Sequence, residues 1–372
     1  MNNIRSPFSV GFRKWSRHGR WLRSINRQCL SPLMNRESWR TLLVLISVAV
    51  PASAHASPMH NTIPKGQDEQ LWPTNSALAG PEEKSVRGNV VDTLIPHMVI
   101  YSPPRDKANG TAVLIMGGGG YHHIEIGREA LPAAKWLTTE GITAAVLYYR
   151  LPSTPLHRAS GSSTVTHSPL TQNTRNIGTT APFQDAQRAM RLLRTHASQW
   201  GINPQRIGVM GFSAGGNLAA ITATRFQHDF YHPVDAADRA SSRPDFAMLL
   251  YPVITLQAPY NYNQSSRIEG RTTADAVAYS AQHYVTRDTP PMFLAQAEDD
   301  PISNVHNSEM MFAALQSHHI PAELHVFEKG GHGWGLRKHG EVAIWPRLAH
   351  DWLQENGYLS VPAHDTAQGH QP

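Results

Sequence analysis

The sequence feature that most restricts how this chain can fold is the segment Gly211–Gly216, which reads GFSAGG and fits the pattern Gly-x-Ser-x-Gly. An apolar run typical of a strand precedes it, and small apolar residues typical of a buried helix follow it. A strand that turns sharply into a helix holds the central serine in a strained conformation, and flanking glycines avoid the clashes that side chains would make there. The motif therefore predicts an exposed Ser213 hydroxyl at the start of a helix, whose dipole favours negative charge.

Short apolar runs and helical repeats alternate along most of the chain. The runs are mostly continuous rather than alternating in polarity, as in strands covered on both faces. They predict strands at residues 98–101, 111–116, 143–149, 206–211, 246–254, 292–297 and 323–327. Helical periodicity is found at 185–200, 214–226 and 304–317. Because strands that alternate with helices form βαβ units, we expect an α/β fold, with one domain over 90–358, a mostly parallel central sheet and helices on both faces.

A serine hydroxyl becomes a strong nucleophile only beside a base that an acid orients. In a sheet of this kind the acid and then the base follow the serine, each on a loop after a later strand. The loops after the last two predicted strands contain Asp299 and Asp300, and then His332 among glycines. The predicted triad is therefore Ser213, Asp300 and His332. Asp299 is the alternative acid; Asp300 is preferred because Pro301 begins the turn directly after it.

Four glycines, Gly117–Gly120, follow the predicted strand that ends at residue 116. At this place such a fold builds the loop whose N–H groups stabilise a developing negative oxygen, and glycine lets those N–H groups turn toward it. We expect an oxyanion hole made by the N–H of Ala214 and that of Gly119 or Gly120. A phosphate-binding loop is excluded because no Gly-Lys-Ser/Thr follows the glycines.

Residues 1–56 are predicted to be a signal peptide. The apolar run 42–50 is too short to span a bilayer, which takes about 20 residues, but it suits the core of a signal peptide. Small residues allow cleavage after Ala56 or Ala54, and Met34 is a candidate start that would shorten the long basic segment before the run. We expect a periplasmic or secreted protein with no stable membrane anchor after cleavage; an uncleaved anchor is the alternative.

Composition sets the other boundaries. Residues 57–89 are rich in Pro, Asn, Ser and Gly and are expected to form an irregular arm. Residues 153–180 have a similar composition and are predicted to be a surface insertion, and 359–372 to be a disordered tail. The single cysteine, Cys29, lies in the leader, so the mature chain has no disulfide, thiol nucleophile or cysteine-based zinc site.

The distribution of charge argues against a nucleic-acid partner. Nine of the 33 Lys and Arg residues lie in the first 56 positions beside one acidic residue, so the rest of the chain is slightly acidic. Histidine is frequent, with 21 residues, but neither His122-His123 nor His318-His319 belongs to a His-Glu-x-x-His helix. A serine triad needs no metal. No metal and no cofactor are expected.

Taken in order, these motifs resemble the α/β-hydrolase superfamily, specifically its acetyl esterase and acetylxylan esterase branch. The resemblance runs over residues 110–340 and rests on LIMGGGGY at 114–121, DAQRA at 185–189, IGVMGFSAGG at 207–216, RPDF at 243–246, EDDP at 298–301 and VFEKGGHG at 326–333. It implies a serine esterase for short acyl esters, chiefly acetyl groups on carbohydrates, with no cofactor. Two departures stand out: Gly117 replaces the usual proline before the glycines, and Ser303-Asn304 replaces the usual Val-Pro after the acidic turn.

Side chains beside the predicted loops are candidate substrate contacts. Tyr121 and His122 directly follow the oxyanion glycines, and Trp334 lies beside His332, where it would either stack on a sugar ring or pack within its loop. Arg128 and Glu129 fit an ion pair at a helix start better than a substrate contact. Asp185 is expected to cap or bridge its helix rather than to take part in chemistry.

Two other functions compete with an esterase. A serine exopeptidase of the same superfamily usually adds an N-terminal propeller or an acidic amine-binding pair. The segment before the first predicted strands is too short for a propeller. A catalytically silent binding module would keep the fold, but such modules usually lose one of the serine, acid and histidine. A fluorophosphonate probe, which labels an activated serine, discriminates an enzyme from such a module.

Overall fold

The computed structural model describes residues 65–73, 84–86, 89–93, 95–151, 180–261, 273–337 and 339–360. The predicted leader, nearly all of the predicted insertion and the predicted tail from residue 361 lie outside these ranges, so all three stay predictions. Within the ranges, no helix is both long and apolar enough to cross a membrane.

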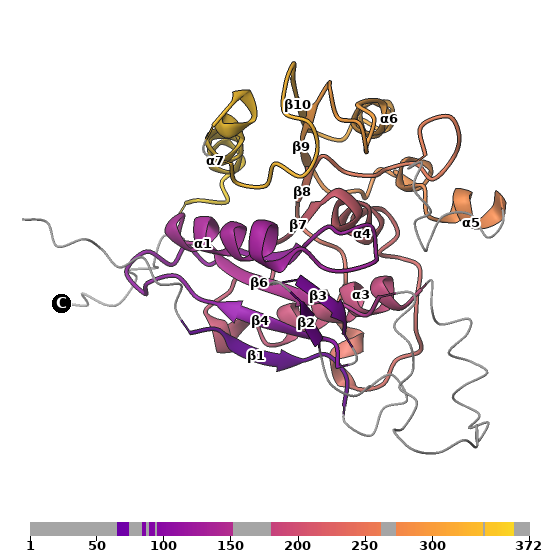
Figure 1. Ribbon diagram of the computed structural model, residues 1–372. Helices are drawn as coiled ribbons and strands as arrows, with labels where there is room; N and C mark the ends of the chain where they lie inside the picture. Colours follow the sequence, from indigo (N-terminus) through magenta and orange to yellow (C-terminus); the bar gives the residue numbers. More distant parts are fainter. Residues whose placement is uncertain are drawn as a thin grey trace, which may run out of the picture. The chain divides into compact units, whose positions relative to one another are not determined.

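The centre of the fold is an eight-stranded sheet in the spatial order β1-β4-β6-β5-β7-β8-β9-β10 (Figure 1). Its strands are β1 (Gln67–Gln70), β4 (His97–Tyr101), β5 (Ala112–Met116), β6 (Thr143–Tyr148), β7 (Ile207–Phe212), β8 (Ala247–Leu250), β9 (Met292–Ala297) and β10 (Ala322–Phe327). The β1–β4 and β4–β6 pairs are antiparallel, and all neighbours from β6 to β10 are parallel. The strands β2 (Lys84–Val86) and β3 (Asn89–Asp92) form a separate antiparallel pair.

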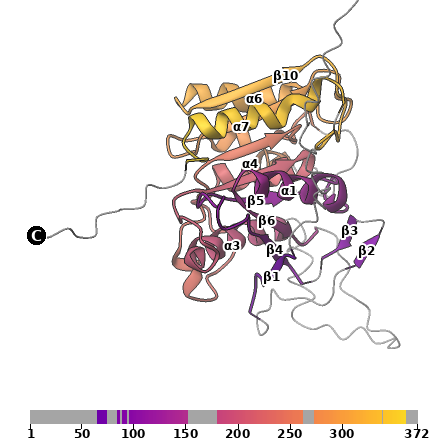
Figure 2. The same ribbon diagram turned by 90° about the vertical axis from the view of Figure 1, so that its left-hand side faces the viewer.

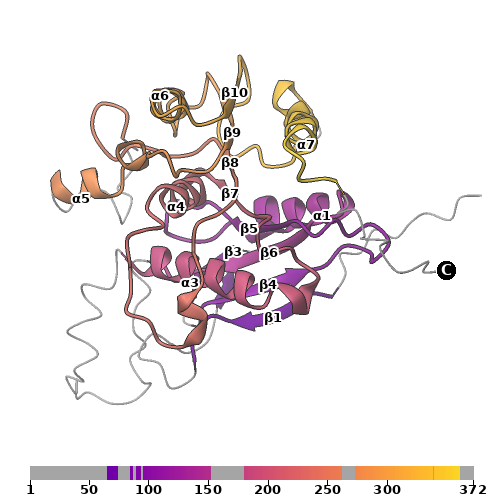
Figure 3. The same ribbon diagram turned by 180° about the vertical axis from the view of Figure 1, so that it is seen from behind.

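Helices cover both faces of this sheet. Opposite views place α1 (Leu131–Thr139) and α7 (Trp345–Glu355) on one face, and α3 (Ala181–Thr195), α4 (Ser213–Thr224) and α6 (His306–Ser317) on the other (Figures 1 and 3). Seen from the side of α1 and α7, these two helices lie in front of the strands (Figure 2). Shorter turns are η1, a π-helical turn (Ile126–Ala130), η2 (Ala197–Trp200), η3 (Ala236–Arg239), α5 (Thr273–Ala278), η4 (Ala281–Tyr284) and η5 (Glu341–Ile344). The predicted α/β class is confirmed.

Continuous apolar sequence explains the central strands. Every residue of β5, β7, β8 and β9 is buried, as expected for strands with helices on both faces. The run 246–254 gives a much shorter strand than predicted, because Tyr251 has a positive φ of 37° that ends the extended backbone at Leu250.

Several elements were not predicted from the sequence. The arm 57–89, expected to be irregular, contains β1 and β2. The sequence of β1, QDEQ, is polar and mostly exposed, and it is extended because it pairs with β4 at the edge of the sheet. The helices α1 and α7 were also missed, although α7 is strongly amphipathic and buries Trp345, Ala349, Trp352 and Leu353.

A buried carboxylate joins α3 to the sheet. Asp185 is fully buried and accepts hydrogen bonds from Trp72 Nε1 at 2.7 Å and from the backbone N–H of Arg150 at 2.8 Å. It also accepts from the guanidinium of Arg150, with Nη2 at 2.7 Å and Nε at 3.0 Å. The expected bridging role of Asp185 is therefore confirmed.

Replacing Asp185 with alanine is expected to lower the free energy of unfolding by about 3–5 kcal/mol, because it leaves the mostly buried Arg150 without its counter-charge. Urea denaturation followed by circular dichroism measures the change. Asp351→Ala is the control: its exposed pair with Arg347 is 4.0 Å long, and its loss should cost less than about 1 kcal/mol. Equal losses in the two variants would contradict a structural role specific to Asp185.

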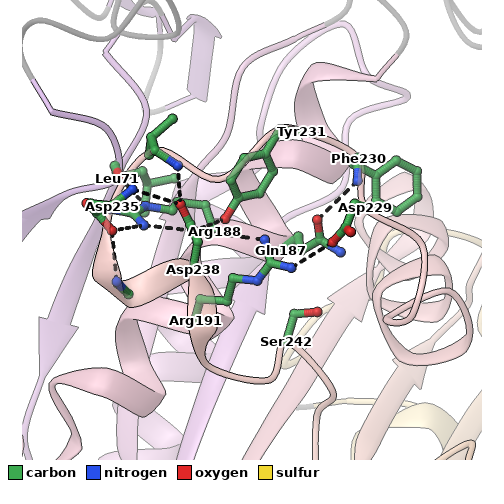
Figure 4. Close-up of polar contacts among 12 residues, drawn as sticks. Leu71, Gln187, Arg188, Arg191, Asp229, Phe230, Tyr231, Asp235, Asp238 and Ser242 are labelled. Atoms are coloured by element: carbon green, nitrogen blue, oxygen red, sulfur yellow. Dashed lines mark hydrogen bonds and ion pairs between the residues drawn. The ribbon is translucent and has the colours of Figure 1, made fainter.

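A second charged cluster holds the segment after α4 against α3. Arg188 donates to Asp235 at 2.8 Å, to Asp238 at 2.9 Å and to the carbonyl of Leu71 at 2.7 Å (Figure 4). Asp235 and Asp238 also form the capping box that begins η3. Each buried charge of this cluster is paired, so the cluster holds α3 in place. Phe183 on α3 packs on Tyr121, with ring centroids 6.4 Å apart.

Candidate active site

The turn between β7 and α4 positions Ser213. The strand ends at Phe212, the helix begins at Ser213, and this serine has a positive φ of 52°. The turn leaves no room for side chains at its glycines: a Cβ on Gly211 would lie 2.1 Å from the Gly215 oxygen, and one on Gly215 would lie 2.2 Å from the Met116 oxygen. The glycines of the motif are therefore required by close backbone approach, and the strain is concentrated at the serine.

The structure brings together the three side chains that the sequence singled out. Ser213 Oγ lies 2.8 Å from His332 Nε2, and His332 Nδ1 lies 2.7 Å from Asp300 Oδ2. Both are hydrogen-bond distances. The arrangement fits a hydroxyl that donates to the imidazole, while the imidazole donates its other N–H to the carboxylate.

Asp300 is held by further donors. Its Oδ1 accepts from the N–H groups of Ile302 at 2.8 Å and Ser303 at 2.9 Å, and its Oδ2 also accepts from Gln296 Nε2 at 3.0 Å. The carboxylate is fully buried. These contacts leave it little freedom to turn away from His332.

The adjacent Asp299 has a different task. Its Oδ1 accepts from the N–H groups of Gly330 at 2.9 Å and Gly331 at 2.7 Å, in the loop that carries His332. The hydrogen bond from Gly331 is the main cause that lowers the pKa of Asp299. Of the two candidate acids, the structure places Asp300 on the histidine and Asp299 on its loop.

The glycine loop after β5 adopts backbone conformations that suit glycine. Gly119 and Gly120 have φ values of 114° and 61°, and a Cβ on Gly119 would lie 2.2 Å from the His123 oxygen. Gly117, where the resemblance described above implies a proline, accepts a hydrogen bond from the Tyr149 hydroxyl at 2.7 Å. This bond restrains the loop at the position where the missing proline ring would have restrained it.

A small cavity opens beside the nucleophile. The volume of this cavity is about 10 Å³. It is lined by Gly120, Tyr121, Ser213, Ala214, Asn217, Val253 and Leu256. The Tyr121 hydroxyl donates to Asn217 Oδ1 at 3.0 Å, and Asn217 Nδ2 donates to the Tyr279 carbonyl at 3.0 Å. The wall made by these two side chains is therefore fixed, and the cavity holds about one water-sized group.

The three predicted substrate contacts have different outcomes. Tyr121 lines the cavity, whereas His122 is exposed and is not among the residues that line it. For Trp334 the sugar platform is wrong and the alternative of packing within the fold is confirmed: only 2% of its surface is exposed, and its ring packs against Tyr251 and Trp345, with centroid distances of 4.5 and 6.1 Å. The indole fills the space behind the histidine loop.

Several residues at the site belong to no motif and were missed by sequence reasoning. Asn217 and Gln296 fix the cavity and the acid as described above. The ion pair expected of Arg128 and Glu129 is not the one observed: Arg128 pairs with Glu125, at 2.8 Å, and Glu129 turns inward. In the ranges that the structure describes, no three His, Cys, Asp or Glu side chains lie close enough together to hold a metal ion.

Comparison with known proteins decides the family. The BD-FAE family model matches residues 172–315, a span that contains Ser213 and Asp300. The crystal structure of an acetyl ester-xyloside bifunctional hydrolase from Caldicellulosiruptor lactoaceticus is 32% identical, with a TM-score of 0.63 over 80% of this chain and 98% of that one. The chain belongs to the α/β-hydrolase esterases. The members of this family are carboxylic ester hydrolases.

Two curated relatives of this esterase are longer than it. The chain is 28% identical over 284 residues to an acetylxylan esterase of Xylanibacter ruminicola, which covers 74% of this chain and 50% of the relative. It is 31% identical over 245 residues to an endo-1,4-beta-xylanase B of Butyrivibrio fibrisolvens, which covers 64% of this chain and 34% of the relative. The chain thus matches half of one relative and about a third of the other.

Proposed function

We propose that this esterase hydrolyses short acyl esters, chiefly acetyl esters of carbohydrates, by a serine mechanism. The observation that carries the proposal is the hydrogen-bonded row of Ser213, His332 and Asp300 beside a cavity for one water-sized group. The carbohydrate part is supported by the relatives described as an acetylxylan esterase and an acetyl ester-xyloside hydrolase. The predicted leader would carry the enzyme to a compartment where such polymers occur.

In this mechanism Ser213 Oγ attacks the ester carbonyl carbon while His332 Nε2 takes the hydroxyl proton. The carbonyl electron pair moves to the oxygen, which the N–H groups of Ala214 and of Gly119 or Gly120 stabilise. When the carbon–oxygen double bond forms again, the alcohol leaves and His332 returns the proton to it. Water then attacks the acyl-enzyme by the same route, and the carboxylic acid and free serine result.

The size of the cavity favours the acetyl group. Such a small cavity suits a short acyl group, whereas a longer acyl chain would press against Val253, Leu256 or the fixed pair of Tyr121 and Asn217. Forcing extra methylenes into a packed site costs about 1–3 kcal/mol. We therefore place the acyl group in this cavity and the alcohol outside it.

Rates on 4-nitrophenyl acetate, butyrate and octanoate test the proposal. We expect kcat/KM to fall by about tenfold or more from acetate to butyrate, because each methylene that does not fit is worth about 1–3 kcal/mol. Leu256→Ala enlarges the cavity and should raise the butyrate-to-acetate ratio by a similar factor, whereas Leu256→Met, which keeps the volume, should change it little. A wild-type preference for octanoate would contradict the assignment. Acetate release from acetylated xylan tests the carbohydrate part separately.

A further inference from the structure

A buried acid lies next to the active-site loops and takes no part in the mechanism above. Glu129 belongs to η1 and is 4% exposed. Burial raises its pKa from the ordinary 4.5 to about 7. Its neighbour Arg128 is largely in solvent and pairs with Glu125 instead. A buried carboxylate is costly to keep ionised unless it accepts hydrogen bonds. The groups that donate to Glu129 are therefore the ones that it holds in place.

One oxygen of Glu129 holds the oxyanion loop. The N–H of Gly118 donates to Glu129 Oε2 at 2.6 Å. Gly118 directly precedes Gly119, one of the two candidate oxyanion donors of this loop, whose φ is 114°. The approach is close enough that a Cβ on Gly118 would lie 3.0 Å from the same carboxylate oxygen and 2.8 Å from the Phe212 oxygen. The carboxylate therefore sets how the first glycines of the loop turn toward Ser213.

The other oxygen of Glu129 holds the histidine loop through a tyrosine. The hydroxyl of Tyr251 donates to Glu129 Oε1 at 2.9 Å and accepts from the N–H of Gly335 at 3.0 Å. The ring of Tyr251 lies edge-on to His332, with centroids 5.0 Å apart. Tyr251 has a positive φ of 37°, so its backbone is strained to bring the phenol to this place.

We propose that Glu129 is a positioning residue that, with Tyr251, fixes the oxyanion loop and the His332 loop relative to each other. This inference rests on the proposed function, because both loops act on the ester only in that mechanism. A carboxylate suits the task, since its two oxygens accept hydrogen bonds from two different loops at once.

The proposal has a consequence for pH dependence. A proton on Glu129 occupies one of its oxygens and competes there with the Gly118 N–H or the Tyr251 hydroxyl, so the loops are held best when Glu129 is ionised. His332 must also be neutral to act as a base. On the acid side, log(kcat/KM) should therefore change by more than one unit per pH unit. The titratable groups that face Glu129 are Glu125 directly before η1, Arg128 on η1, Tyr149 after β6, Tyr251 after β8 and His332 after β10.

Steady-state kinetics of three variants test the proposal, with kcat calculated per serine that a fluorophosphonate labels, so that misfolded protein is not counted. Glu129→Gln keeps the shape but only one acceptor oxygen, and Tyr251→Phe removes the link to Gly335. Each should lower kcat by about tenfold, the effect of one hydrogen bond, with KM changed less than twofold. In Glu129→Gln the acid limb should have a slope of one. The surface control Arg128→Lys, which keeps the positive charge beside Glu129, should behave as the wild type does.

Wild-type kcat in Glu129→Gln, or an acid limb identical to that of the wild type, would overturn the proposal. A rise in KM with unchanged kcat would also overturn it, because it would assign Glu129 to substrate binding. The rate of Ser213 labelling separates this inference from the proposed function. If the wild type is labelled but cleaves no ester, the proposed function fails, and slower labelling of Glu129→Gln still supports positioning. If the wild type is not labelled, both fail.

Discussion

Alanine in place of His332 is expected to lower kcat for acetyl esters by about 10⁵–10⁶-fold, and Ser213→Ala should lower it by a similar factor. Without the imidazole, 2.8 Å from the hydroxyl, the proton of Ser213 has no acceptor as its oxygen attacks. KM should change little, because His332 does not line the acyl cavity and Ser213→Ala removes only one oxygen from its wall. Initial rates of 4-nitrophenyl acetate hydrolysis over a range of substrate concentrations measure kcat and KM of both variants.

The double variant Ser213→Ala/His332→Ala decides whether the two residues act as one unit. We expect it to be no slower than either single variant, because each loss alone already disables the serine route, and the remaining rate comes from the oxyanion N–H groups and from binding. Losses that multiply would indicate two independent contributions and contradict the proposed mechanism. Full activity in Ser213→Ala would assign the nucleophile to another residue.

Local sequence carried enough information to single out Ser213 and His332. Ser213 is positioned by a turn whose strand, glycines and helix are contiguous in the chain. His332 lies on a glycine-rich loop directly after a strand, with positive φ values at Gly331 and Gly333. Such contexts are determined by neighbouring residues, and so they can be read from the sequence alone. The parallel sheet was predictable for the same reason, because its buried strands are continuous apolar runs.

Contacts between distant residues could not be predicted in this way. The link from Tyr251 to Glu129 joins residues 122 positions apart, and the link from Tyr121 to Asn217 spans 96 positions. Neither pair forms a motif, and both depend on how β8, η1 and α4 meet in space. The sequence left two alternatives for Trp334 for a related reason: an aromatic residue beside such a loop has the same sequence whether it faces solvent or packs on Trp345.

The preference for Asp300 over Asp299 rested on Pro301 alone and agrees with the structure, and it leads to the sharpest contrast between two adjacent residues. Asp300→Asn is expected to lower kcat by about 10⁴-fold. The carboxylate accepts the His332 Nδ1–H at 2.7 Å, whereas an asparagine amide that presents its NH₂ group there favours the wrong tautomer. Gln296 Nε2 already donates to the same carboxylate oxygen at 3.0 Å. In Asp300→Asn this donor would meet the new NH₂ group.

Asp299→Asn is the matched control for this prediction, because it makes the same chemical change one residue earlier. An asparagine oxygen can still accept the N–H groups of Gly330 and Gly331, so kcat should fall by less than about tenfold, the effect of weakening one hydrogen-bonded contact. A large loss in Asp299→Asn with a small one in Asp300→Asn would reverse the assignment. Small losses in both would mean that the imidazole needs no acid to orient it. Only the predicted contrast fits a carboxylate that acts through His332 and a neighbour that shapes the loop.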